Sequence, residues 1–301
     1  MSGWESRWGP LRAKRQAIDQ GDPPPAVPPA PPPPAQSPPH APRPAEQSPS
    51  VPSLPAPLPP AESVCVVLAT YNRLGPLRVA VESIRARAGL SCHFVVVDGG
   101  SSDGSRRWLV DQADVTFIGQ RGPLTGAVLA FNLGFAFAVE RGYPYVAHFN
   151  DDAELVTDGA MARGVQILEA NADIGEVAFE QNFRGTWGFE DIHGKIYANF
   201  GLVRRSAGIA VAVAQGDPTG RAWWHPIYRT YAADSEFGCQ LHRLGWVVNA
   251  AVGLCVNDLQ VQDELRVLNE SDNPDRRDSK LFWSRWPDRA SLDSQKEGKA
   301  P

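Results

Sequence analysis

The chain has 301 residues and a formal net charge of −5 at pH 7, and no basic cluster dominates it, so its composition does not favour nucleic acid as a main partner. Its length is enough for one sizeable α/β domain, and it contains no apolar run of the roughly 20 residues that a membrane-spanning helix needs. Its four cysteines show no CxxC spacing, which favours a reducing compartment and predicts a cytoplasmic protein.

Residues 1–60 are predicted to form a disordered, proline-rich tail. The stretch 22–60 holds 19 of the 28 prolines. Proline lacks a backbone donor and fixes φ, so we expect this stretch to be extended and to join neither a helix nor a sheet. Such a tail could dock into the aromatic-lined grooves of partner domains, which is one alternative function for the chain.

From Ser63 the chain alternates between short apolar runs and helical stretches. The predicted strands are SVCVVLAT (63–70), CHFVVVD (92–98), VTFI (115–118) and YVAHFN (145–150). The predicted helices that follow them cover 75–89, 105–113, 125–142 and 158–172. This alternation predicts an α/β fold with a mostly parallel central sheet and helices on both faces.

After Ile174 the alternation weakens. We predict shorter strands and turns over 175–205, a helix over 233–244 and a last strand within WVVNAAVGLCV. Beyond Asp272 the chain is mostly polar, which predicts a polar C-terminal tail over 273–301. The predicted domain is therefore 61–272, with a first half over 61–155 and a second half over 156–272.

Three of the predicted strands end in polar segments, namely TYNR (70–73), DGGSSDG (98–104) and NDD (150–152). Each segment alone is also typical of a helix cap or a glycine turn. Because ligands gather where the carboxyl ends of parallel strands meet, their joint occurrence predicts one crevice. The adjacent carboxylates of Asp151 and Asp152 repel each other, and a hard divalent cation would offset that repulsion.

These segments resemble the nucleotide-binding half of family 2 glycosyltransferases, which have the GT-A fold. The resemblance rests on VVLATYNRLGPLRVAVESI, FVVVDGGSSDGS, AFNLGFAFA and the DxD-like NDDAEL, and it runs from about Ser63 to Leu155. It continues more loosely to about Val256 through GLVRRS and DSEFGCQLHRLGW. The resemblance implies that the first half binds the nucleotide and that the second half faces the acceptor.

The resemblance also implies roles for individual residues. The positions that correspond to nucleotide-sugar contacts are Thr70, Tyr71, Asn72, Arg73, Asp98, Asn132, Asn150 and Asp151. Asp152 corresponds to the ligand of a Mg²⁺ or Mn²⁺ ion, which would act as a Lewis acid on the leaving diphosphate. Asp234 corresponds to the catalytic base and Glu236 to the second acid of the same motif. An aspartate at a helix start is also typical of an N-cap, and the two roles are compatible.

Three positions depart from the family pattern. Phe131 stands where many members have arginine, and Ala233 replaces the first acid of the motif that contains the base. Asn257 and Asp258 stand where many members have a metal-binding histidine, so one of them must substitute if any residue does. Asp258 is the candidate oxygen ligand, and its alternative is a solvated loop acid. These departures leave open a catalytically inactive nucleotide-sugar-binding or scaffold protein.

The resemblance as a whole implies an inverting, metal-assisted glycosyltransferase. Its expected donor is a UDP-, GDP- or dTDP-sugar, and its expected acceptor is a hydroxyl of a glycan, a glycolipid or a small metabolite. The segment SKLFWSRWPDR mixes aromatic and basic side chains and could associate weakly with the inner membrane face.

Overall fold

A computed structural model describes residues 63–120, 124–183 and 185–293. The chain divides into two units, Met1–Pro52 and Ser53–Pro301, and the described residues all belong to the second. The predicted proline-rich tail over 1–60 lies outside the described residues. Within them, no helix combines the length and the apolar character that a bilayer span requires.

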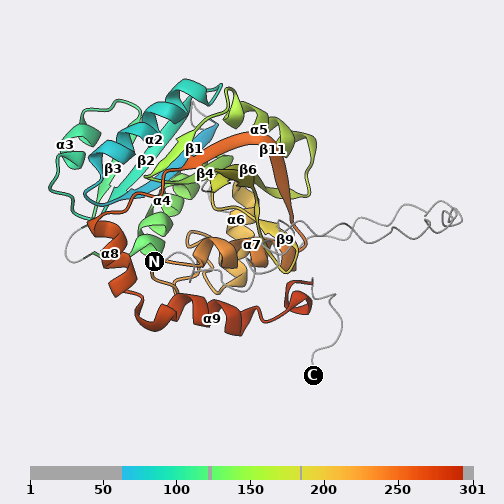
Figure 1. Cartoon of the computed structure of the whole chain (residues 1–301). Helices are drawn as coiled ribbons and strands as arrows, with labels where there is room; N and C mark the ends of the chain where they lie inside the picture. Colours follow the sequence, from blue (N-terminus) through green and yellow to red (C-terminus); the bar gives the residue numbers. More distant parts are fainter. Residues whose placement is uncertain (1–62, 121–123, 184, 294–301) are drawn as a thin grey trace, which may run out of the picture. The chain divides into compact units, whose positions relative to one another are not determined.

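The unit is built on one mixed sheet whose strands follow the order β3–β2–β1–β4–β10–β6–β11–β5 (Figure 1). The strands are β1 (Val64–Thr70), β2 (Cys92–Asp98), β3 (Val115–Gly119), β4 (Tyr145–Asn150), β5 (Ala153–Leu155), β6 (Ile174–Phe183), β10 (Gly201–Arg204) and β11 (Val247–Asp258). The first four in the spatial order run parallel, and so do β6 and β11, whereas β10 and β5 run antiparallel to their neighbours. The α/β, mostly parallel architecture predicted from the sequence is confirmed.

The remaining three strands are short. β7 (Thr186–Gly188) joins the same sheet as a hairpin with β6, whereas β8 (Glu190–Ile192) and β9 (Lys195–Tyr197) form a separate antiparallel pair. They correspond to the region after Ile174 in which only short strands and turns are predicted.

Helices cover both faces of the sheet (Figure 1). The helices on one face are α2 (Leu74–Arg87) and α5 (Ala160–Ala170), and those on the other are α4 (Ala127–Arg141), α6 (Arg205–Ala214) and α7 (Ala233–Arg243). A short helix, α3 (Ser105–Val110), follows β2. Because β1 is covered on both sides, the five residues 64–68 are all fully buried, which explains their unbroken apolar run.

Helix α4 lies very close to β1 at Gly134, in the AFNLGFAFA stretch. A Cβ atom at this position would stand 2.3 Å from Cγ1 of Val67, which is nearer than atoms can approach. We expect Gly134→Ala to lower the free energy of unfolding by about 1–3 kcal/mol, because the helix must shift or the valine must leave its rotamer. Chemical denaturation measures this. Gly75→Ala in α2 is the matched control, since its Cβ would meet nothing within 4 Å, and equal stability of the two variants would contradict the prediction.

The chain after β11 differs from the predicted polar tail over 273–301. It forms α8 (Glu264–Ser271), a 3-10 turn over Pro274–Arg276, α9 (Arg277–Arg285) and a second 3-10 turn over Arg289–Leu292. Phe282 and Trp286 are each only 1% exposed, so α9 is packed onto the domain. The sequence did not reveal this because these two side chains, four positions apart, are the main apolar anchors of a short helix. They also belong to the segment expected to contact a membrane, yet they face the protein interior.

Candidate functional site

The carboxyl ends of β2, β1 and β4 lie side by side at one edge of the sheet. Thr70 pairs in register with Asp98, and Ala69 pairs with Asn150. The three polar segments that follow these strands therefore come together, as their positions at the ends of parallel strands predict. Asn150 itself is exposed at this edge.

A buried cluster of opposite charges lies directly after β4. The Thr70 hydroxyl donates to Oδ2 of Asp151 at 2.8 Å, and Nη1 of Arg73 donates to Oδ1 of Asp151 at 2.9 Å. The same Nη1 lies 3.3 Å from Oδ2 of Asp152. All four side chains are buried. Two adjacent buried carboxylates repel each other, so the guanidinium and the hydroxyl are what stabilise them here.

Burial and charge shift the pKa values of this cluster. Burial raises the pKa of Asp151 to about 7, the Arg73 charge opposes that shift and the Asp152 charge adds to it. Burial alone would lower the pKa of Arg73, but its hydrogen bond to Asp263 and the two nearby carboxylates raise it. The guanidinium therefore stays charged.

The segment after β11 closes over the cluster. The Leu259 N–H donates to the carbonyl of Asp152 at 2.9 Å, and the Val261 N–H donates to its Oδ2 at 3.3 Å. Asp263, the N-cap of α8, accepts Nε and Nη2 of Arg73 at 2.7 and 2.9 Å. A bidentate ion pair between a guanidinium and a carboxylate is directional and strong. The pair therefore holds the start of α8 against the strand ends.

A cavity of about 50 Å³ lies beside the charged cluster. Its lining includes Tyr71 from the loop after β1, Gly99 after β2, Ala130 from α4 and Leu265 from α8. A Cβ atom at Gly99 would come within 2.5 Å of Cδ1 of Leu124, so a larger residue here would force that leucine side chain to move. A mainly apolar slot next to a charged cluster suits a ligand with one flat apolar part and one anionic part.

Asn72 and Asp98, two of the predicted nucleotide contacts, form hydrogen bonds within the loops after β1 and β2. The Asn72 N–H donates to Oγ of Ser101 at 2.8 Å, and its Oδ1 accepts the Ser102 N–H at 2.8 Å. Asp98 is fully buried and accepts the N–H groups of Gly100 and Ser101 at 3.1 Å. These two side chains therefore set the shape of the loops after β1 and β2, whatever else they contact.

The predicted base lies at the start of α7. The loop that precedes this helix is hydrogen-bonded to α4. Asn132 of α4 donates to the Trp224 carbonyl at 2.7 Å and accepts its N–H at 3.0 Å, so this predicted nucleotide contact anchors that loop. Ala232 adopts a left-handed φ of 64°, which turns the chain into the helix. Asp234 follows in the first turn, where its Oδ1 accepts the Ser235 N–H at 2.8 Å.

The model of glycosyl transferase family 2 matches residues 65–216 of this chain. The chain belongs to this family. A comparison with curated protein sequences gave no match.

Solved structures of glycosyltransferases share the fold of this family 2 chain. The mannosyltransferase PcManGT from Pyrobaculum calidifontis, in complex with GDP-Man and Mn²⁺, is 18% identical with a TM-score of 0.54, over 80% of this chain and 66% of that one. TarS 1-349 of S. aureus, in complex with UDP-GlcNAc, is 10% identical with a TM-score of 0.51, over 67% of this chain and 60% of that one. This chain therefore spans about two thirds or less of each of these structures.

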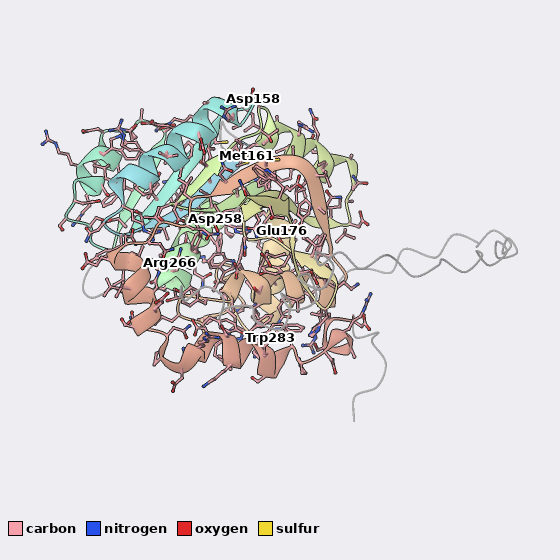
Figure 2. The ribbon with its side chains drawn as sticks, viewed as in Figure 1. Asp158, Met161, Glu176, Asp258, Arg266 and Trp283 are labelled. Carbon is pink, nitrogen blue, oxygen red and sulfur yellow. The ribbon has the colours of Figure 1, made fainter. Side chains whose placement is uncertain are left out.

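A divalent cation at the family 2 site would take part of its coordination from the substrate. Among the described residues, no group of three or more His, Cys, Asp or Glu side chains could hold a metal ion. Mg²⁺ is usually bound by one or two carboxylates together with substrate phosphates, so such a group is not required. Asp152 would supply a hard oxygen donor, and its Oδ2 lies 3.3 Å from Nη1 of Arg73 and 3.8 Å from Nη2 of Arg266, two guanidinium groups whose place the cation would take. Asp258 pairs in register with Ala153 on the neighbouring strand. Figure 2 marks Asp258 at the end of β11 and Arg266 on α8.

Glu236, which corresponds to the second acid of the family's base motif, anchors the C-terminal helix. It is fully buried and accepts from Nη2 of Arg285 at 2.8 Å, the Tyr228 hydroxyl at 2.9 Å, Nε2 of Gln240 at 3.0 Å and the indole N–H of Trp286. Burial alone would raise its pKa, but these donors lower it, so the carboxylate is charged. Helix α9 is thus tied to the helix that carries Asp234.

Arg285→Ala should loosen this anchor. We expect the free energy of unfolding to fall by about 2 kcal/mol, because a buried carboxylate loses its charged hydrogen-bond donor. Thermal and denaturant unfolding measure the loss. Arg289→Ala, in the same C-terminal segment, serves as the control, since no ion pair is found for Arg289 among the described residues. Equal stability of the two variants would show that the Arg285 contact contributes nothing.

The structure also reveals a buried pair that the sequence analysis saw only in part. Nε2 of His148, a buried residue of β4, lies 2.9 Å from Oε1 of Glu176, a buried residue of β6. Gly201 makes room for the pair, because a Cβ there would stand 2.6 Å from that Oε1. Burial raises the pKa of Glu176, His148 opposes the shift and the Asp234 charge adds to it, so the pair lies within electrostatic reach of the predicted base.

Proposed function

We propose that this chain is an inverting glycosyltransferase that moves a hexosyl or deoxyhexosyl group from a nucleoside diphosphate sugar to a hydroxyl acceptor. One observation carries the proposal: the apolar slot beside Tyr71 adjoins the carboxylates of Asp151 and Asp152 at a single sheet edge. Membership of glycosyl transferase family 2 supports it, as do the nucleotide sugars bound by PcManGT and TarS.

In this proposal the slot takes the nucleoside and the charged cluster takes the diphosphate. The Tyr71 ring packs on the base, while Asp98, Thr70 and Asp151 line the nucleoside. Arg73 is cationic and placed to face the phosphates once the donor competes for its carboxylate partners. A Mg²⁺ or Mn²⁺ ion held by Asp152, with Asp258 as a second ligand, would supply Lewis acidity to the leaving diphosphate.

Asp234 is the proposed catalytic base. It accepts the proton of the acceptor hydroxyl while that oxygen attacks the anomeric carbon. The bond between the anomeric carbon and the diphosphate oxygen breaks in the same step, and the nucleoside diphosphate leaves with the electron pair. Attack from the face opposite the leaving group inverts the configuration at that carbon.

Calorimetric titration of the full chain tests this function. UDP, GDP and dTDP are each titrated with Mn²⁺ and again with EDTA, and the matching nucleotide sugar is then assayed for release of its diphosphate. Metal-dependent binding of one nucleotide, followed by sugar release, is the expected result. Binding without release would instead favour a nucleotide-sugar-binding protein, and no binding of any nucleotide would overturn the proposal.

A further inference from the structure

Four side chains form a row across the sheet beyond the charged cluster. Trp187 of β7 is the register partner of Asn182 of β6, Asn182 is the partner of Asn257 of β11, and Asn257 is the partner of Glu154 of β5. Register partners in a sheet project from the same face, so these four residues share one face. Trp187 is 42% exposed, and the other three are partly exposed.

Hydrogen bonds join the polar members of the row into a chain. Nδ2 of Asn182 donates to Oδ1 of Asn257 at 3.1 Å, and Nδ2 of Asn257 donates to Oε2 of Glu154 at 3.0 Å. Oδ1 of Asn182 accepts the Gly185 N–H at 2.8 Å, which fixes the hairpin. These hydrogen bonds hold the side chains of the row in place. Each amide nitrogen carries two N–H groups and uses one of them in the row, so the second can donate to a ligand.

The row lies on the face of the sheet that carries the predicted base. Ala153, Leu155 and Val256 belong to the core under α2 and α5. Side chains alternate along a strand, so Glu154 and Asn257 project to the opposite face, where α7 packs against β11. Glu154 is also two residues from Asp152, so the row begins beside the proposed metal ligand.

We propose that Trp187, Asn182, Asn257 and Glu154 form an acceptor subsite that binds a pyranose unit of a saccharide. A pyranose ring has an apolar C–H face that stacks on an exposed indole. Its hydroxyl groups both donate and accept hydrogen bonds. The two amides and the carboxylate of the row offer both donors and acceptors to such groups. This inference rests on the proposed function and narrows its acceptor from any hydroxyl compound to a sugar.

Saturation-transfer NMR on the full chain tests the subsite. The probes are the methyl α- and β-pyranosides of glucose, galactose and mannose, with acyclic sorbitol as the control compound, in the absence and presence of Mn²⁺ with UDP, GDP or dTDP. We expect saturation of the ring protons of at least one pyranoside and none of sorbitol. Trp187→Ala should weaken that binding about tenfold, whereas Trp187→Phe, which keeps an aromatic face, should retain most of it. Asn182→Ala should weaken it as well.

Absence of pyranoside binding by the wild type, or equal binding by Trp187→Ala, would overturn the subsite. Nucleotide titration of the same samples separates this failure from that of the proposed function. Nucleotide binding that persists without pyranoside binding refutes the subsite alone, whereas loss of both refutes the glycosyltransferase assignment too. Val252→Ala, which alters an exposed side chain of β11 that is not in the row, should behave as the wild type.

Discussion

Asp234→Asn is expected to lower the turnover of the nucleotide sugar by about 10²–10⁴-fold while donor binding stays within twofold of the wild type. Asparagine keeps an oxygen that can accept the Ser235 N–H, so the start of α7 should be preserved. It has no basicity, however, and cannot take the proton of the acceptor hydroxyl. Release of nucleoside diphosphate from the donor measures the loss, and calorimetry measures the binding.

Asp158→Asn is the matched control for this variant. Its carboxylate is 83% exposed, pairs with Arg87 and lies outside the crevice, so turnover should be unchanged. Turnover of Asp234→Asn within tenfold of the control would remove Asp234 from the role of base. Glu176, which Asp234 influences electrostatically, would then be the next carboxylate to test.

Asp152→Ala is expected to abolish the metal dependence of donor binding and to weaken binding in Mn²⁺ by at least about 100-fold. The reason is the loss of the carboxylate that would hold the cation against the diphosphate. Titration with the nucleotide, in Mn²⁺ and in EDTA, gives both quantities. Asp258→Asn, measured alongside, shows whether the second carboxylate contributes to the same site.

The Asp152 variant needs a stability control, because the carboxylate also contacts Arg73 and the backbone N–H of Val261. Its melting temperature is therefore compared with that of the wild type before binding is interpreted. If a folded Asp152→Ala protein binds the donor in Mn²⁺ as tightly as the wild type, the metal assignment is wrong. Arg73 would then be the main cation that the donor meets.

The strands and helices of the first half could be predicted from the sequence because each has a strong local signal. The fully buried run at 64–68 and the paired glycines at 99 and 100 mark a strand and a turn without reference to the rest of the chain. The meeting of Thr70, Asp98 and Asn150 followed from the rule that parallel strands end at one edge. Position in the chain was sufficient for these inferences.

The remainder of the site depends on partners that are distant in sequence. Arg73 matches a nucleotide-contact position, yet it pairs with Asp263, 190 residues later. Glu236 matches a catalytic-motif acid, yet it anchors Arg285, 49 residues later. Spacing carries no signal for such pairs, and α9 itself has too few apolar positions to stand out in a single sequence. Asn72, Asp98 and Asn132 match nucleotide-contact positions, and the structure shows that each also holds a loop through hydrogen bonds.

The Arg73–Asp263 fork has a consequence for how the protein is made. Strands β1 to β4 can pair while the later part of the chain is still being synthesised, since their contacts fall within the first half of the domain. The guanidinium of Arg73 can form its bidentate ion pair only after Asp263 has left the ribosome. The ion pair between Glu236 and Arg285 forms later still, because Arg285 is synthesised after Asp263. Folding should therefore end with the C-terminal helices docking onto an otherwise formed sheet, and a nascent chain halted before Asp263 should expose the crevice to proteases.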